Sequence, residues 1–227
     1  MKLNRLAQQI KLDWKLASRH QILVTAILLG LFLSAVLRIF FPSQERLIET
    51  SLGLMVVVST TAIFLGASLF WIPRLSGVWT ALEVTPVRPL ELLLSKGSIF
   101  LGLYGLFGAL VLLASLGFVQ INPGLFPGLL SLAWTQGYLG YWLALRQKTI
   151  SGFMAQALGW VFLFQIPVLA LVLGWSQKIW HLFPGYGSVA WVVGQAELVD
   201  FLVMFFWATF PFYLCLNRLR KRRCADE

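Results

Sequence analysis

The sequence predicts an all-α protein that crosses a membrane six times. Of its 227 residues, 59% are hydrophobic and only 12% are charged, whereas about a quarter of the residues of a soluble domain are charged. This composition excludes a soluble globular protein, a disordered chain and a small disulfide-stabilised scaffold. The net charge of +9 would indicate nucleic-acid binding in a soluble chain, so its meaning depends on where the charges lie.

Six segments are long and apolar enough to cross the hydrocarbon core as helices. A helix needs about 20 apolar residues for this, and it satisfies its own backbone polar groups within the lipid. The segments are residues 22–41, 50–72, 97–119, 124–145, 152–175 and 195–216. The sixth carries Glu197 and Asp200 in its first turns, which makes it the least clear of the six.

The basic residues predict the orientation of these spans. Of the 18 Lys and Arg residues, all but Arg38, Arg46 and Lys178 lie in the two terminal segments and in the second and fourth connections. Because cytoplasmic connections carry the excess of basic residues, both termini, including the basic tail 217–227, are predicted to be cytoplasmic. The charge therefore indicates membrane topology, and no nucleic-acid partner is expected.

Residues 1–20 are predicted to form an amphipathic helix before the first span. Apolar residues recur at intervals of three and four, and most basic residues lie off that face; the apolar positions are Leu3, Leu6, Ala7, Ile10, Trp14 and Ala17. Such a helix is expected to lie on the anionic inner leaflet of the membrane. Two interpretations stay open: a simple basic anchor, or an elbow helix that braces the transmembrane helices.

The connection between the second and third spans, residues 73–96, is the most informative part of the chain. Ser76 is suited to cap a short helix that runs to Glu83, with Val78, Trp79 and Leu82 on one side. This part of the connection is therefore predicted to be a short amphipathic helix on the cytoplasmic side.

Two prolines follow that helix. Pro86 and Pro89 force an extended break, since each disfavours helix in the residue before it. Pro89 also suits the first position of a new helix, with Glu91 in the first turn, where a carboxylate complements the helix dipole. A short helix, a rigid break and a return into the membrane form a stiff element that could pass a push from a soluble partner into the third span. We call residues 76–91 the coupling segment.

Residues 74–96, which include the coupling segment, resemble the cytoplasmic signature of ABC-2 type transporter permeases. In that family the pattern E-x-x-G-x-x-x-x-L-x-x-(T/S)-P-(V/L)-x-P-x-E-x-x-x-(S/G)-K follows the second span. The matching residues here are Gly77, Leu82, Thr85, Pro86, Val87, Pro89, Glu91, Ser95 and Lys96. Arg74 stands where the family has an acidic residue, so no salt bridge to an ATPase is carried over at that position. The resemblance extends over the whole chain and is closest to the branch of drug or fluoroquinolone exporters.

The resemblance implies a single ABC-2 type transmembrane domain over residues 1–227, in the bacterial plasma (inner) membrane. It implies a coupling helix that docks on a separate ATPase subunit, short re-entrant helices within residues 176–194 on the outer side, and a second permease copy or a related permease. ATP and Mg²⁺ would be held by the partner ATPase, and no cofactor is expected in this chain. The residues implied to transmit ATPase motion are Ser76, Gly77, Val78, Trp79, Leu82, Glu83, Thr85, Pro86, Pro89 and Glu91.

The chain lacks the motifs of an enzyme. No Gly-x-x-x-x-Gly-Lys-Ser/Thr loop is present to cradle a nucleotide phosphate, and no nucleophile or metal-ligand motif occurs. We therefore expect a transport subunit without catalytic or metal-binding residues, whose ATP hydrolysis takes place in another chain.

Five polar residues are candidates for a substrate path or an outer vestibule: Gln136, Gln156, Gln165, Glu197 and Asp200. The glutamines could instead form hydrogen bonds between helices. The two carboxylates could reach outer water, or they could hold the outer segment through Lys178.

The sequence thus favours the permease of an ABC exporter. The few charges within the spans favour a drug-like, lipidic or other amphipathic substrate. The alternatives are a haem-maturation type permease, the membrane subunit of a vitamin importer or, from a different class, an intramembrane enzyme or a membrane assembly factor.

Overall fold

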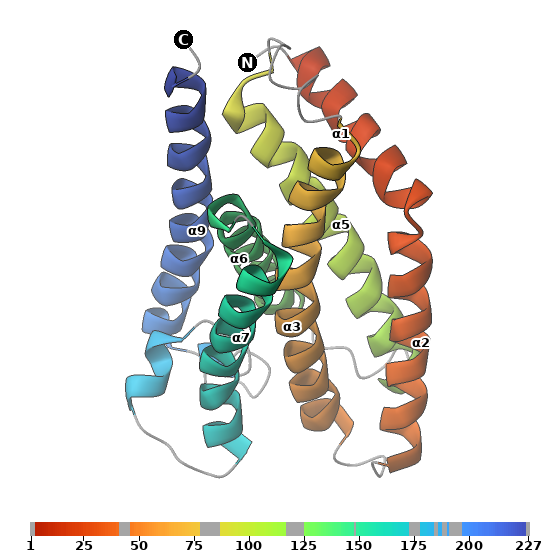
Figure 1. Cartoon of the computed structure of the whole chain (residues 1–227). Coiled ribbons are helices and arrows are strands. Elements are labelled where there is room, and N and C mark those ends of the chain that lie inside the picture. Colours follow the sequence, from red (N-terminus) through yellow and green to blue (C-terminus); the bar gives the residue numbers. More distant parts are fainter. Residues whose placement is uncertain are drawn as a thin grey trace.

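The structure is a bundle of long helices (Figure 1). It is a computed structural model that describes residues 3–40, 46–77, 87–116, 125–147, 149–172, 178–183, 186–187, 190 and 197–225, and these residues contain no strand. The helices are α1 (Leu3–Arg19), α2 (Ile22–Phe40), α3 (Arg46–Leu75), α5 (Pro89–Leu116), α6 (Leu125–Arg146), α7 (Ile150–Val172) and α9 (Leu198–Ala225), with a short 3-10 helix, η2 (Lys178–Leu182). The predicted all-α class is confirmed for these residues.

The described residues of each predicted span lie almost entirely in one helix, but the helices differ in their suitability for lipid. Among the described residues, three helices are long and apolar enough to cross a membrane by themselves: Leu52–Leu75, Pro89–Ala114 and Leu198–Lys221. Two further segments, Arg5–Arg19 and Val24–Val36, pass the same test as a pair with a bend of 63°. The chain is therefore compatible with a membrane protein, and the six-span arrangement stays a prediction.

The helix α6 is surrounded by other helices, and this position explains why its sequence combines small, polar and apolar residues. It packs against α3, α5, α7 and α9, and every residue from Thr135 to Tyr141 is buried. Lipid demands an apolar surface, but a helix surrounded by other helices can carry small and polar residues. The glycines, glutamine and tyrosines of α6 thus reflect protein neighbours and not lipid.

Glycines bring α3 and α6 into backbone contact. A Cβ atom on Gly66 would overlap with the carbonyl oxygen of Gly137, and one on Gly140 would overlap with that of Ile63. Without side chains at these positions, the two helices approach closely and gain van der Waals contact, which is the main attraction between helices in lipid.

Aromatic side chains join α6 to α5 and α9 through their polar ends. The Tyr138 hydroxyl donates a hydrogen bond to the Leu93 carbonyl oxygen on α5 (2.5 Å), and the Trp134 indole donates to the Ala208 carbonyl oxygen on α9 (3.1 Å). The rings of Phe100 and Phe212 lie edge-on to Tyr138, with centroids 5.3 and 5.1 Å away. This cluster binds three helices together with its polar atoms satisfied.

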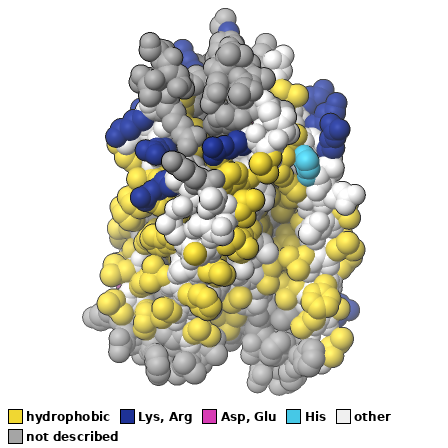
Figure 2. Space-filling model, viewed as in Figure 1, with side chains coloured by type: hydrophobic (Ala, Val, Ile, Leu, Met, Phe, Trp, Pro, Cys, Tyr) yellow, Lys and Arg dark blue, Asp and Glu magenta, His cyan; other side chains and the backbone are white. Residues whose placement is uncertain are grey.

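The basic side chains lie mostly at one end of the bundle. The beginning of α1 and the end of α9 lie at this end, as do the end of α3 and the beginning of α5 (Figure 1). Figure 2 shows most Lys and Arg side chains of the visible face at this end, above a broad band of hydrophobic side chains. This is the distribution that the basic residues of the sequence predict for a cytoplasmic end and a lipid-facing body.

Substitution of Gly140 by alanine tests the contact between α3 and α6. The added methyl group would overlap with backbone, which cannot rotate away, so we expect a loss of about 1–3 kcal/mol of stability and a lower melting temperature in detergent. The matched control is Gly159→Ala on α7, where a Cβ meets nothing within 4 Å. Equal melting temperatures for the two variants would contradict the close contact.

Candidate functional site

The N-terminal helix α1 is held against α5 by a polar cluster inside the protein. Gln9, Asp13 and Ala17, each one turn after the previous one, are buried, and α1 packs against α5. Trp14 lies on Gly102 of α5, where a Cβ would come within 2.5 Å of its ring. The buried face of α1 therefore includes two polar residues beside Ala17, while Leu6, Ile10 and Trp14 are partly buried and Ala7 is exposed.

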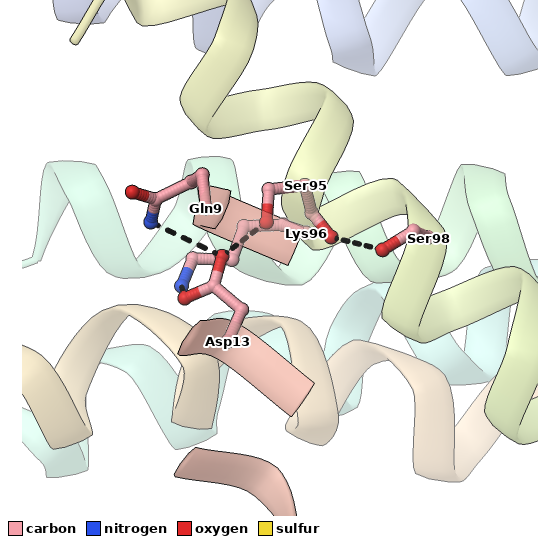
Figure 3. A network of polar contacts seen from close by, with 5 residues as sticks. All are labelled: Gln9, Asp13, Ser95, Lys96 and Ser98. Atoms are coloured by element: carbon pink, nitrogen blue, oxygen red, sulfur yellow. Dashed lines mark hydrogen bonds and ion pairs between the residues drawn. The ribbon is translucent and has the colours of Figure 1, made fainter. Parts of the chain in front are cut away.

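Asp13 is the centre of this cluster (Figure 3). Its Oδ1 atom lies 2.6 Å from Lys96 Nζ, and its Oδ2 atom accepts a hydrogen bond of 2.5 Å from the Ser95 hydroxyl. The Gln9 amide donates to the same Oδ2 atom at 3.4 Å. The side chains of Lys96 and Asp13 are 1% and 7% exposed, so this ion pair is shielded from water. We call Gln9, Asp13, Ser95 and Lys96 the Asp13 cluster.

Burial makes the Asp13 cluster sensitive to the loss of one member. Each ion costs several kcal/mol to remove from water, and the attraction between the two charges and their hydrogen bonds offsets this cost. An ammonium group left at this position without its carboxylate would have no compensation. The docking of α1 on α5 thus depends on both partners being present.

The same stretch of α5 contains the end of the coupling segment. The helix begins at Pro89, as predicted, and Glu91 accepts a hydrogen bond from the Arg88 backbone N–H at 3.1 Å. Glu91 is 2% exposed, so its carboxylate fixes the first turn as half of a capping box. Lys96 follows Glu91 by five residues, which is about 7.5 Å along the helix axis.

Ser76 and Gly77 mark the other end of the coupling segment, where α3 finishes. The Ser76 hydroxyl donates to the carbonyl oxygen of Ile72 at 2.9 Å, and Gly77 has a φ of 73°. Ser76 thus binds back to α3. The predicted helix that Ser76 would cap includes Val78, Trp79, Leu82 and Glu83, and these residues lie outside the described part together with Thr85 and Pro86.

The five candidate path residues do not come together in one site. Gln136 is buried on α6, and its amide has no hydrogen-bond partner among the described residues. Gln156 is exposed on α7. Gln165 donates to the Ser59 hydroxyl and to the Val56 carbonyl oxygen on α3, so it joins α7 to α3 as an interhelical hydrogen bond would.

The two carboxylates at the start of α9 have different environments. Glu197 is exposed, whereas Asp200 is fully buried. Asp200 lies 2.7 Å from His181 Nδ1 on η2 and accepts a hydrogen bond of 2.8 Å from the Glu197 backbone N–H. Asp200 therefore binds the segment that precedes α9 through His181, a partner that the sequence analysis did not name.

The described residues and the comparisons with known proteins give no further indication of a site. Among the side chains that the structure describes, no group of three His, Cys, Asp or Glu residues could hold a metal ion. Comparisons of the chain with models of protein families, with curated proteins and with solved structures gave no match. The arguments for function therefore come from the chain itself.

A double-mutant cycle tests the ion pair. We expect Asp13→Asn to destabilise the protein by about 3–5 kcal/mol, because Lys96 stays buried without a counter-ion. The double variant with Lys96→Met should be more stable than Asp13→Asn alone, since both charges are gone. The measurement is thermal unfolding in detergent, with Lys11→Met on the exposed side of α1 as the control. Additive effects of the two substitutions would contradict the pairing.

Proposed function

We propose that the chain is the membrane-spanning subunit of an ABC-2 type exporter, with six spans and both termini in the cytoplasm. The resemblance of residues 74–96 to the permease signature supports this proposal. The apolar helices, the band of hydrophobic side chains and the basic residues at one end of the bundle also support it.

The contacts that the signature residues make with α1 are the main structural support for this proposal. The signature ends in Ser95 and Lys96, and both residues bind Asp13 on α1. The first turn of α5 is also fixed, through Glu91. A push on the coupling segment would therefore move α5 and α1 together, since a helix with a buried, satisfied end transmits force as a rigid body.

This arrangement suggests a mechanism. Two ATPase subunits close on ATP, press on the coupling segments of two permease copies, or of this chain and a related permease, and tilt α5 with α1 relative to α3 and α6. The path for the substrate opens between the two permeases. A drug-like, lipidic or other amphipathic substrate is consistent with the few charged side chains within the helices.

The coupling segment is tested by co-expression with the ATPase encoded beside this chain. We expect Trp79→Asp with Leu82→Asp to abolish co-purification of the ATPase while membrane insertion stays normal, because charges would replace the apolar docking side. Leu182→Asp introduces one such charge on the exposed side of η2, which lies on the outer side of the membrane in the proposed topology. This control should leave the complex intact. An intact complex with the double variant would sink the assignment of this docking surface.

The orientation is tested by cysteine labelling in whole cells, in a background with Cys224→Ser. A membrane-impermeant maleimide should label Asn122→Cys, which lies in the predicted third connection outside the cell, and not Ser18→Cys at the end of α1. Labelling of Ser18→Cys in intact cells would reverse the proposed topology.

A further inference from the structure

A groove of about 400 Å³ lies between α2, α3 and α5. His20 and Ile72 lie at one end, Thr61 and Phe107 lie toward the other, and α5 contributes Leu103 and Tyr104 to the wall. Figure 2 shows the surface hollowed on this face, below the histidine at the basic end of the bundle. None of the candidate path residues lines this groove, so it is a separate feature of the molecule.

The length of the groove matches one leaflet of a membrane. From Ile72 to Thr61, at 1.5 Å per residue, the groove follows α3 for about 16 Å. One half of a hydrocarbon core is about 15 Å thick. In the proposed orientation, the groove begins at the cytoplasmic interface and ends near the middle of the membrane.

The walls favour an apolar occupant, although several carry hydroxyl groups. Those hydroxyl groups donate their hydrogen bonds within the protein: Thr25 to Gln21 (3.0 Å), Ser68 to Phe64 (2.9 Å) and Tyr104 to Thr61 (3.0 Å). Their donors are therefore already used. The remaining surface is mainly aliphatic and aromatic, as in sites for hydrophobic ligands.

The rim at the basic end favours a negative charge. Arg19 and His20 are exposed at the junction of α1 and α2, and His20 lines the groove. Near the basic end of the surrounding helices, the carboxylates of Asp13 and Glu91 are buried and already bonded, and Glu49 lies near the opposite end of α3. Basic rims between helices on the cytoplasmic side bind anionic lipid headgroups.

We infer that this groove binds one acyl chain of an anionic phospholipid from the inner leaflet. The chain lies along Leu65 and Leu103, and the headgroup lies at Arg19 and His20. The inference rests on the proposed orientation in the membrane, but it involves neither an ATPase nor a transported substrate. The occupied groove would support α2 against α3 and α5.

The test uses the full chain in phosphatidylcholine nanodiscs that contain a minor share of phosphatidylglycerol with a photoreactive diazirine on one acyl chain. Cross-links located by mass spectrometry are expected on peptides that contain Ala26, Leu65 and Leu103. Ala26→Trp fills the groove, so labelling there should fall about tenfold. The control Ala35→Trp places the same side chain at an exposed position of the same helix and should leave labelling unchanged.

A second arm tests the headgroup and does not depend on the folding of the tryptophan variant. Arg19→Glu should lower labelling by the phosphatidylglycerol probe to the level of a phosphatidylcholine probe with the same acyl chain. Equal labelling by the two probes in the unmodified protein would overturn the anionic headgroup. Labels spread evenly over the exposed faces of α7 and α9 would overturn the groove as a lipid site. Because no ATPase is present, failure here is distinguishable from failure of the coupling experiment.

Discussion

The ion pair between Asp13 and Lys96 is the interaction on which the arrangement of the cytoplasmic end depends. It joins the N-terminal helix to α5 within two turns of the point where the coupling segment ends. Because both charges are buried, the pair is costly to break. A state in which α1 is only partly docked on α5 is therefore disfavoured. The helix α1 is therefore packed against α5 as part of the bundle, and its role as an elbow that braces the transmembrane helices stays a prediction. Its basic residues Arg5, Lys11, Lys15 and Arg19 are exposed.

The groove and the ion pair both involve α5 and the connected helices α1 and α2. α1 is bound to α5 by Asp13, and α2 continues from α1 after a bend to form one wall of the groove. α5 contributes both Lys96 and the groove residues Leu103 and Tyr104. A displacement of α5 would therefore alter the position of α1 and the width of the groove together. In an exporter, this would couple the ATPase to the lipid that surrounds the permease.

The helices could be predicted from the sequence because hydropathy and proline position are local signals. Pro89 and Glu91 marked the start of α5 correctly, since a helix start is decided within one turn. Asp13 could not be found in this way. It follows Leu6 by two turns and so lies beside the apolar face of α1, but its partner is 83 residues away. Likewise, the sequence offers Lys178 or outer water for Asp200, whereas the fold brings His181 to it.

The Asp13 cluster makes α1 and α5 one unit, so the distance between them should be fixed. Spin labels at Lys11→Cys on α1 and Arg88→Cys before α5 would measure it directly, in lipid nanodiscs and with Cys224→Ser, since Cys215 is buried. We expect one narrow distance distribution for the native cluster and a broad or longer one for Asp13→Asn. A distribution that is already broad in the native protein, or one that Asp13→Asn leaves unchanged, would show that the Asp13 cluster does not join α1 to α5.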